Sequence, residues 1–222
     1  MRRFLPLLFF LFLTACATPQ AISVDVERER VDVYVDAFSE AWLPALYTCA
    51  ERSPVWLVAR TPNVDAAKLI LHVTPNPEPG IAAYAVGEIE FVLAVNDANP
   101  VEMLTADEIR AIYTGQVTNW SQLGGDDASI QVWAYTPETG LNGILLGQGI
   151  LSSLAYQAQS PRAMRDALAS DSAAVGILPV EMESTEAGIR HIPSAEMKFP
   201  VLLMLPDEQD GLKLLAACLQ EK

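Results

Sequence analysis

Apolar residues recur at every second position in some segments of the chain and at every third or fourth position in others. Alternation at every second position, or a short continuous apolar run, is typical of strands, and the longer spacing is typical of helices. Strands are expected over 24–35, 55–59, 68–73, 89–96, 130–134, 173–178 and 201–205. Helices are expected over 39–51, 105–115, 141–157, from 160 onward, and over a last segment that contains Leu212, Leu215, Ala216 and Leu219. This alternation of strands and helices predicts an α/β fold with mostly parallel sheets.

The sequence predicts the first residues of two helices. Thr105 precedes a helical pattern and Glu108 follows three residues later, which is a capping box, and Gly115 is a suitable stop. Ser160 and Pro161 begin a further helix, with a cap residue followed by a proline in the first turn.

The amino terminus has the composition of a secretory signal. Arg2 and Arg3 precede an apolar run over 4–13. Ten residues of helix reach about 15 Å, which is half the thickness of a hydrocarbon core, so the run is too short to cross a membrane. A basic start, a short apolar stretch and small residues after it are typical of a secretory signal.

The next residues are more specific, because Leu13-Thr14-Ala15-Cys16 resembles the bacterial lipoprotein processing box. The resemblance implies a signal peptide over 1–15, acylation of Cys16 (palmitate among the chains) and a lipidated tether over 16–23. Several acyl chains would hold the protein at the extracytoplasmic side of the cell envelope, anchored to a membrane. The alternative is a simple secretory signal followed by an unrelated cysteine.

Two further cysteines remain, Cys49 and Cys218, one in an early helix and one in the last. An even number of thiols in an oxidising compartment favours a disulfide between these helices. Two separately buried thiols are the alternative.

The net charge of the chain limits the kinds of partner that can be expected. The 222 residues carry 28 acidic and 14 basic side chains, a formal net charge of −14, so a nucleic-acid partner is not expected. Three cysteines and two histidines leave little material for a metal site, and we expect no metal and no cofactor.

Several landmarks occur in a distinctive order, namely Val95-Asn96-Asp97-Ala98-Asn99-Pro100, the capping box, Ile112-Tyr113-Thr114-Gly115, Thr118-Asn119-Trp120, and Ala173-Ala174-Val175-Gly176-Ile177-Leu178-Pro179. Together they resemble the phosphate-binding proteins of bacterial ABC transporters, which belong to the type 2 periplasmic binding-protein superfamily. The motifs cover residues 91–180 well and the two ends loosely.

The resemblance implies two α/β lobes, with the second lobe inserted in the first. Lobe 1 is then expected over 24–97 and 175–222, and lobe 2 over 98–174. A small-molecule ligand would bind in the cleft between them, an ABC transporter permease would be the partner, and the chain would act as a monomer. Helix N-termini carry unpaired N–H groups and a partial positive charge, so such a cleft suits a small anion.

The ligand-contacting stretches of the family are matched only in part. Residues 131–140 correspond to a strand and loop that in the family contain an arginine, but Ala134 or Tyr135 stands in its place, and Glu138 adds a negative charge. The ligand-binding residues expected from this correspondence, and from the turns at 36–39 and 60–63, are Ser39, Arg60, Thr61, Tyr135, Thr136, Thr139 and Gly140. Losing an arginine–phosphate pair removes about 1.5–3 kcal/mol of binding free energy, which argues against tight phosphate binding.

Alternatives exist for several of these residues. Arg60 either replaces the missing cation or is a solvated strand end. Phe38, Tyr84, Trp133 and Tyr135 either line a cleft for an organic ligand or pack beneath neighbouring helices.

Three functions are therefore considered. The first is a solute-binding lipoprotein of an ABC-type uptake system with a small ligand, for which a phosphate-like anion is one candidate. The second is a degenerate binding-protein fold that serves as a sensory or scaffolding envelope lipoprotein. The third is a hydrolase that uses Ser39 or Ser172 with a distant histidine, but the chain contains none of the common catalytic motifs, and we expect no enzymatic activity.

Overall fold

The computed structural model describes residues 28–137, 141–142, 151–182 and 188–221. The signal segment, Cys16, Thr139 and Gly140 lie outside these ranges. Within them, no helix has the length and apolar content needed to span a bilayer.

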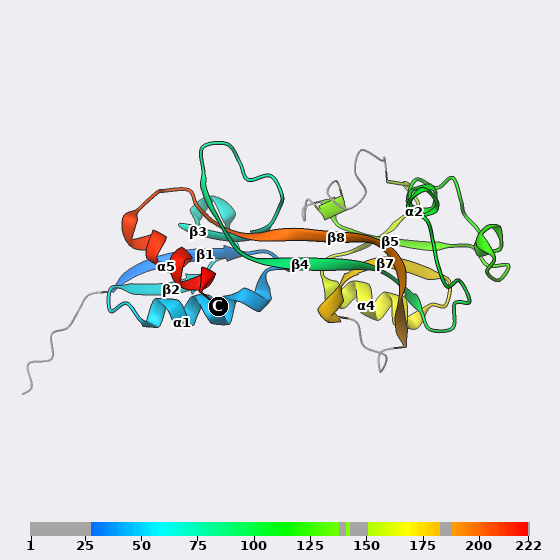
Figure 1. The fold of residues 1–222 in the computed structure, drawn as a ribbon, viewed down its shortest axis with the longest axis horizontal. Helices are drawn as coiled ribbons and strands as arrows, with labels where there is room; N and C mark the ends of the chain where they lie inside the picture. The colour runs from blue at the N-terminus through cyan, green and yellow to red at the C-terminus, as the bar shows by residue number, and fades with distance from the viewer. Residues whose placement is uncertain (1–27, 138–140, 143–150, 183–187, 222) are drawn as a thin grey trace, which may run out of the picture.

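The described strands form one sheet in the order β2-β1-β3-β8-β4-β7-β5-β6. Their bounds are β1 (Glu29–Val35), β2 (Trp56–Arg60), β3 (Leu69–Val73), β4 (Ala82–Asn96), β5 (Gln131–Tyr135), β6 (Tyr156–Ala158), β7 (Ala174–Pro179) and β8 (Ile189–Leu205). Figure 1 shows two lobes: β1, β2 and β3 lie in one, β5 and β7 lie in the other, and the long strands β4 and β8 run through both.

The direction of the strands changes along the sheet. At one end β1 pairs in parallel with β2 and β3, and at the other β5 pairs in parallel with β6 and β7. The middle is antiparallel, because β8 pairs with β3 and β4, and β4 pairs with β7. The expectation of mostly parallel sheets therefore holds only at the two ends. A chain that enters the second lobe once and leaves it once must cross between the lobes in opposite directions.

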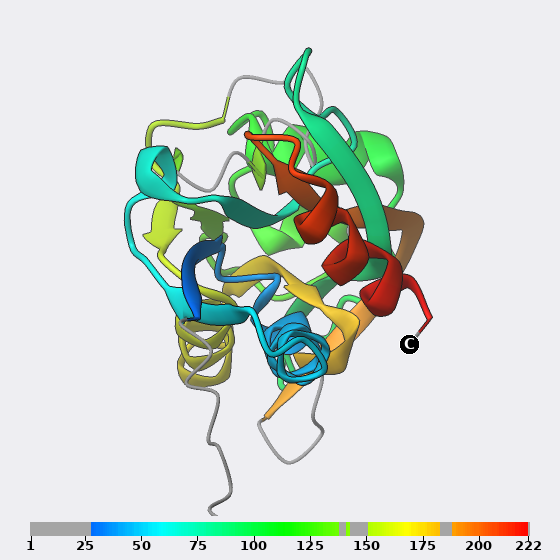
Figure 2. The ribbon, with the colours of Figure 1, turned by 90° about the vertical axis from the view of Figure 1, so that its left-hand side faces the viewer.

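Helices cover the sheet in both lobes. They are α1 (Leu43–Glu51), α2 (Ala106–Tyr113), α4 (Pro161–Ser170) and α5 (Asp210–Gln220), with short 3-10 turns η1 (Glu40–Trp42), η2 (Val64–Ala66), η3 (Trp120–Leu123) and η5 (Val180–Met182). Figure 2 shows the molecule from the end of the lobe that contains α1 and α5. A disulfide between Cys49 of α1 and Cys218 of α5 joins these two helices, with a Cα–Cα distance of 5.9 Å.

The helix starts read from the sequence are present. The Thr105 hydroxyl accepts from the N–H of Glu108, and the Glu108 carboxylate accepts from the N–H of Thr105, so the capping box of α2 is complete. In α4, Ser160 is the N-cap and Met164 and Leu168 are buried.

Two boundaries differ from the sequence prediction. The helix expected over 141–157 is wrong at its end, because residues Tyr156–Ala158 form β6 and pair with β5. The Tyr156 ring stacks on Trp133 of β5 at 5.1 Å, a cross-strand contact that no local pattern reveals. The helix expected over 39–51 begins as the η1 turn, and α1 follows with Pro44 in its first turn, where a proline is tolerated.

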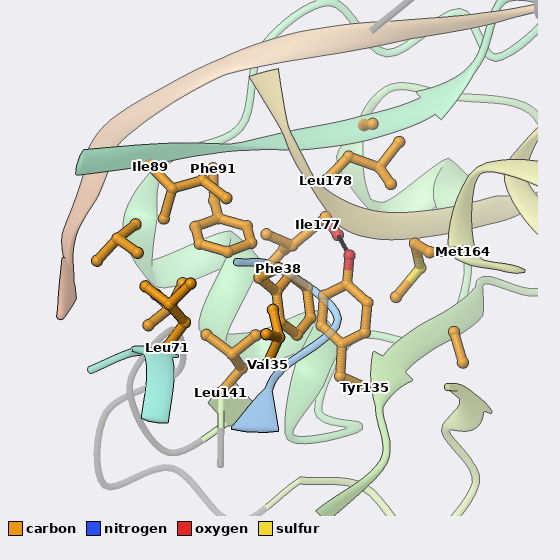
Figure 3. Packing of buried hydrophobic residues seen from close by; sticks show 14 of the residues in the cluster. Val35, Phe38, Leu71, Ile89, Phe91, Tyr135, Leu141, Met164, Ile177 and Leu178 are labelled. Carbon is orange, nitrogen blue, oxygen red and sulfur yellow. Dashed lines mark hydrogen bonds between the residues drawn. The ribbon is translucent and has the colours of Figure 1, made fainter. Parts of the chain in front are cut away.

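One hydrophobic core extends through both lobes. It joins Val33 and Leu71 of the first lobe to Met164 of the second. Phe38, Phe91 and Tyr135 lie at the junction of the two halves (Figure 3). The lobes are therefore in apolar contact at their junction.

Candidate functional site

The carboxyl ends of the parallel strands β1 and β3 meet at the turn that follows β1. In open α/β sheets ligands bind outside the carboxyl ends of the strands, so this turn is the first place to look for a site. The side chain at its start is Asp36, which is buried with 8% of its surface exposed.

The Asp36 carboxylate accepts four hydrogen bonds. One oxygen, Oδ1, accepts from the backbone N–H groups of Phe38 (2.9 Å) and Ser39 (2.7 Å). The other, Oδ2, accepts from the N–H of Val73 (2.8 Å) and lies 2.7 Å from Nδ1 of His72. A carboxylate with this number of donors is held in its charged form.

Opposing effects act on the pKa of Asp36. Burial raises the pKa, but the hydrogen bonds from His72 and from the Val73 N–H, together with the charge of His72, outweigh it and hold the pKa below its ordinary value. Since the carboxylate is ionised, Nδ1 of His72 carries the proton of their shared hydrogen bond.

Phe38 fills the space between the lobes next to this turn. Its ring packs edge-on against Tyr135 of β5, with ring centroids 4.7 Å apart, and against Phe91 of β4 at 5.6 Å. Figure 3 shows the Phe38 ring among these side chains, with the Tyr135 hydroxyl directed to the carbonyl of Ile177. An apolar side chain therefore fills this part of the junction between the lobes.

The expected ligand-binding residues that the structure describes have different surroundings. Arg60 and Thr61 share an open hollow of about 450 Å³ with Tyr34, Val35 and Pro62. Ser39 is fully buried, and its hydroxyl has no hydrogen-bond partner among the described residues. Thr136 lies directly after β5.

Two of these residues have other roles in the structure. Arg60 forms an ion pair with Glu40 at 2.5 Å, so its charge is compensated from within the chain. Tyr135 belongs to the core: it is 1% exposed, and its hydroxyl donates to the Ile177 carbonyl at 2.7 Å. Burial raises the pKa of Tyr135, which keeps the hydroxyl protonated as a donor.

A second cavity lies where the lobes meet beside η1 and the start of α4. Its volume is about 570 Å³. It is lined by Ala37, Phe38, Glu40, Ala41, Trp42, Ile89, Ser160, Pro161, Arg162, Pro179, Glu181 and Met182. Most of these side chains are apolar, and the charged ones among them are Glu40, Arg162 and Glu181. The cavity can hold a small molecule with an apolar body.

Sequence reasoning did not find this cavity. Nothing in the local sequence pattern around Trp42 and Met182 places them opposite α4. One sequence signal near the cavity was available. Asp36 is an acid directly after a buried strand, in the turn that contains the cavity-lining residues Ala37 and Phe38.

The described residues form neither a metal cluster nor a Ser39–His72 catalytic pair. They contain no group of three histidine, cysteine, aspartate or glutamate side chains placed to hold a metal ion. The pairing of Ser39 with His72 that a hydrolase would need is not made, because the Ser39 hydroxyl is unpartnered among the described residues and Nδ1 of His72 faces Asp36.

A family model for the PBP superfamily domain matches residues 65–208. The chain belongs to the PBP superfamily. The match confirms the α/β fold with a second lobe inserted in the first. None of the curated proteins compared with the sequence matches it.

Solved structures show the same fold at low identity. A putative phosphate ABC transporter substrate-binding protein with bound phosphate from Clostridium perfringens superposes with a TM-score of 0.71 at 15% identity, over 86% of this chain and 92% of that one. An ABC-type phosphate transport receptor from Vibrio cholerae gives 0.65 at 18%, over 86% and 94%. The reduced form of OxyR from N. meningitidis gives 0.61 at 18%, over the same shares. At such identities the likeness extends to the fold alone.

Proposed function

We propose that this PBP-superfamily chain is an extracytoplasmic solute-binding lipoprotein that delivers a small molecule to an ABC-type permease. The observation that carries the proposal is the cavity of about 570 Å³ at the junction of the lobes. This volume lies within the range of about 300–1,000 Å³ that is usual for small-molecule sites. Two chains of the same fold, one named as a putative phosphate ABC transporter substrate-binding protein and one as an ABC-type phosphate transport receptor, support the assignment.

The walls of the cavity indicate the kind of solute. Phe38, Trp42 and Ile89 present apolar surface from the first lobe and the crossing strand β4, and Met182 adds more after β7. A ligand with a compact apolar body would remove this surface from water, which is the main source of affinity in such a pocket. Arg162 and Glu181 would set its orientation through polar groups.

The lipoprotein part of the proposal depends on Leu13-Thr14-Ala15-Cys16. Acylation of Cys16 would keep the binding domain beside a membrane permease, and the Cys49–Cys218 disulfide agrees with an oxidising compartment. Mass spectrometry of the mature protein should find acyl chains on Cys16. Cys16→Ser should release the protein from the membrane fraction, and a wild-type Cys16 without acyl chains would contradict the anchor.

Ligand binding is tested by native mass spectrometry of the protein purified gently from its own membranes. We expect a bound small molecule in the wild type and its loss in Ala41→Trp, because Ala41 is an exposed alanine that lines the cavity. Ala163→Trp is the matched control, since Ala163 is exposed on α4 but does not line the cavity. Equal retention of the molecule in both variants would place it elsewhere and remove the support for this cavity.

The second candidate is a sensory or scaffolding envelope lipoprotein, and the packing of Phe38 favours it. Rings from the turn after β1, from β4 and from β5 make one apolar contact between the lobes. Such a contact resists the hinge opening on which solute-binding proteins of two lobes depend. Capture of an envelope protein without transporter subunits, from a wild type that carries no small molecule, would favour this candidate over the first.

A further inference from the structure

We propose that Asp36 is a built-in anion, whose carboxylate takes up the hydrogen-bond donors at the carboxyl ends of β1 and β3 and so excludes phosphate and other free oxyanions from them. The inference deepens the proposed solute-binding function, on which its meaning rests, by defining a class of solute that this turn does not bind.

The donors around Asp36 are those that a free oxyanion would require. Three of them are backbone N–H groups, of Phe38 and Ser39 in the turn and of Val73 at the end of β3. The fourth is Nδ1 of His72. Backbone N–H groups that converge at the end of a strand, with a cationic or neutral imidazole beside them, form a good anion site.

All four donors are already used by one carboxylate. Their distances to its oxygens, 2.7–2.9 Å, are those of charge-assisted hydrogen bonds. A phosphate that approached this turn would find these N–H groups occupied and would meet a buried negative charge. The carboxylate is also part of the chain, so it binds without the entropy cost that a free anion incurs.

The arginine at the end of β2 is also paired within the chain. Arg60, at the end of β2, forms its ion pair with Glu40, the residue that follows Ser39. Asp36 in the turn and Glu40 in η1 are therefore each paired with polar groups from neighbouring strands. A ligand would instead be recognised in the apolar cavity, which η1 lines with Glu40, Ala41 and Trp42.

The test is chemical rescue of the full chain after removal of the carboxylate. Asp36→Ala leaves the four donors around an empty space. We expect a lower melting temperature than that of the wild type, and a rise of several degrees when sodium formate or sodium phosphate replaces sodium chloride at equal ionic strength. Phosphate stabilises folded proteins in general relative to chloride, so the rise in the variant is judged against the wild type, which should show only this general effect of each salt.

Asp32→Ala is the matched control, because Asp32 is an acid of the same strand, β1, whose carboxylate is paired with Arg30 at the surface. It should show no rescue by formate. If Asp36→Ala does not fold in chloride, the yield of refolding replaces melting: recovery in formate but not in chloride supports the proposal, and failure in both overturns it.

Stabilisation of the wild type by phosphate, with one ion bound per chain in calorimetry, would also overturn the proposal. Its failure is separate from failure of the solute-binding function. Formate rescue does not depend on the cavity beside η1, and loss of a bound solute in Ala41→Trp does not depend on Asp36.

Discussion

Phe38 occupies a position in which a single residue type changes what a turn can do. It follows the first strand, is 4% exposed and makes edge-on contacts with rings from two other strands. Aromatic pairs of this kind contribute about 0.5–1.5 kcal/mol beyond the burial of their surface. The Phe38 side chain therefore contacts both lobes and stabilises their packing against each other.

Truncation of this ring should be costly. Phe38→Ala should lower the free energy of unfolding by about 3–5 kcal/mol, because it removes a buried aromatic side chain and leaves a cavity between Phe91 and Tyr135. Urea unfolding of the two proteins measures the difference. Leu214→Ala, at a leucine that is 72% exposed, should change the same quantity by less than about 0.5 kcal/mol. A Phe38→Ala loss as small as that of the control would contradict the packing.

The lowered pKa of Asp36 predicts how the free energy of unfolding depends on pH. Its pKa is held below the ordinary value in the folded protein, chiefly because the hydrogen bonds from His72 and Val73 overcome the effect of burial. The stabilisation is therefore complete above the unfolded pKa of about 3.9 and is lost as the pH falls from there through the folded pKa.

Urea unfolding between pH 7 and pH 3 tests this dependence. The wild type should exceed Asp36→Asn in the free energy of unfolding at about pH 5, and the difference should shrink below about pH 4, because only the wild type must protonate this carboxylate. A difference that stays constant down to pH 3 would show that the Asp36 pKa is the same in the folded and unfolded chains.

Among the described α-helices, α2 is the one whose N-terminal capping box is complete within the local sequence. Both hydrogen bonds of its capping box are present, and the Glu108 carboxylate that accepts from Thr105 has a lowered pKa because of these bonds. Such a helix start can be read from the sequence because every group involved lies within four residues.

Removal of this cap should weaken the element measurably. Thr105→Ala should cost about 0.5–2 kcal/mol in the free energy of unfolding, since the N–H of Glu108 loses its acceptor. Thr118→Ala is the matched control: Thr118 is exposed, and its hydroxyl makes no hydrogen bond that the described residues reveal. Its effect should stay within about 0.5 kcal/mol, and an equal loss in both variants would mean that the cap has no special role.

On the scale of the whole molecule, the Cys49–Cys218 disulfide links two helices that are 169 residues apart in the chain. A bridge across so long a loop mainly restricts the unfolded chain. It closes the first lobe, because α1 belongs to the beginning of the described chain and α5 to its end (Figure 2).

Cys49→Ala/Cys218→Ala should therefore lower the free energy of unfolding by about 2–5 kcal/mol. A reductant should shift the urea midpoint of the wild type in the same direction and leave that of the double variant unchanged. Thiol counting on the denatured, unreduced protein provides the check, because two free thiols in addition to Cys16 would contradict the bridge.

The sequence by itself determined the features whose causes are local or periodic. The α/β alternation, the starts of α2 and α4, and the family resemblance over 91–180 all depend on residues close to one another in the chain. Most strand positions were predicted for the same reason, although β4 and β8 extend well beyond the apolar runs that revealed them.

Only the tertiary structure decided what the candidate site is. Asp36 reaches donors on β3 that lie 36 and 37 residues away, Phe38 meets a ring on β5, and Arg60 is neutralised by Glu40 across 20 residues. The strand β6 likewise depends on its pairing with β5. These contacts are set by which strands lie side by side and by which side chains then satisfy one another, and a one-dimensional pattern does not contain that information.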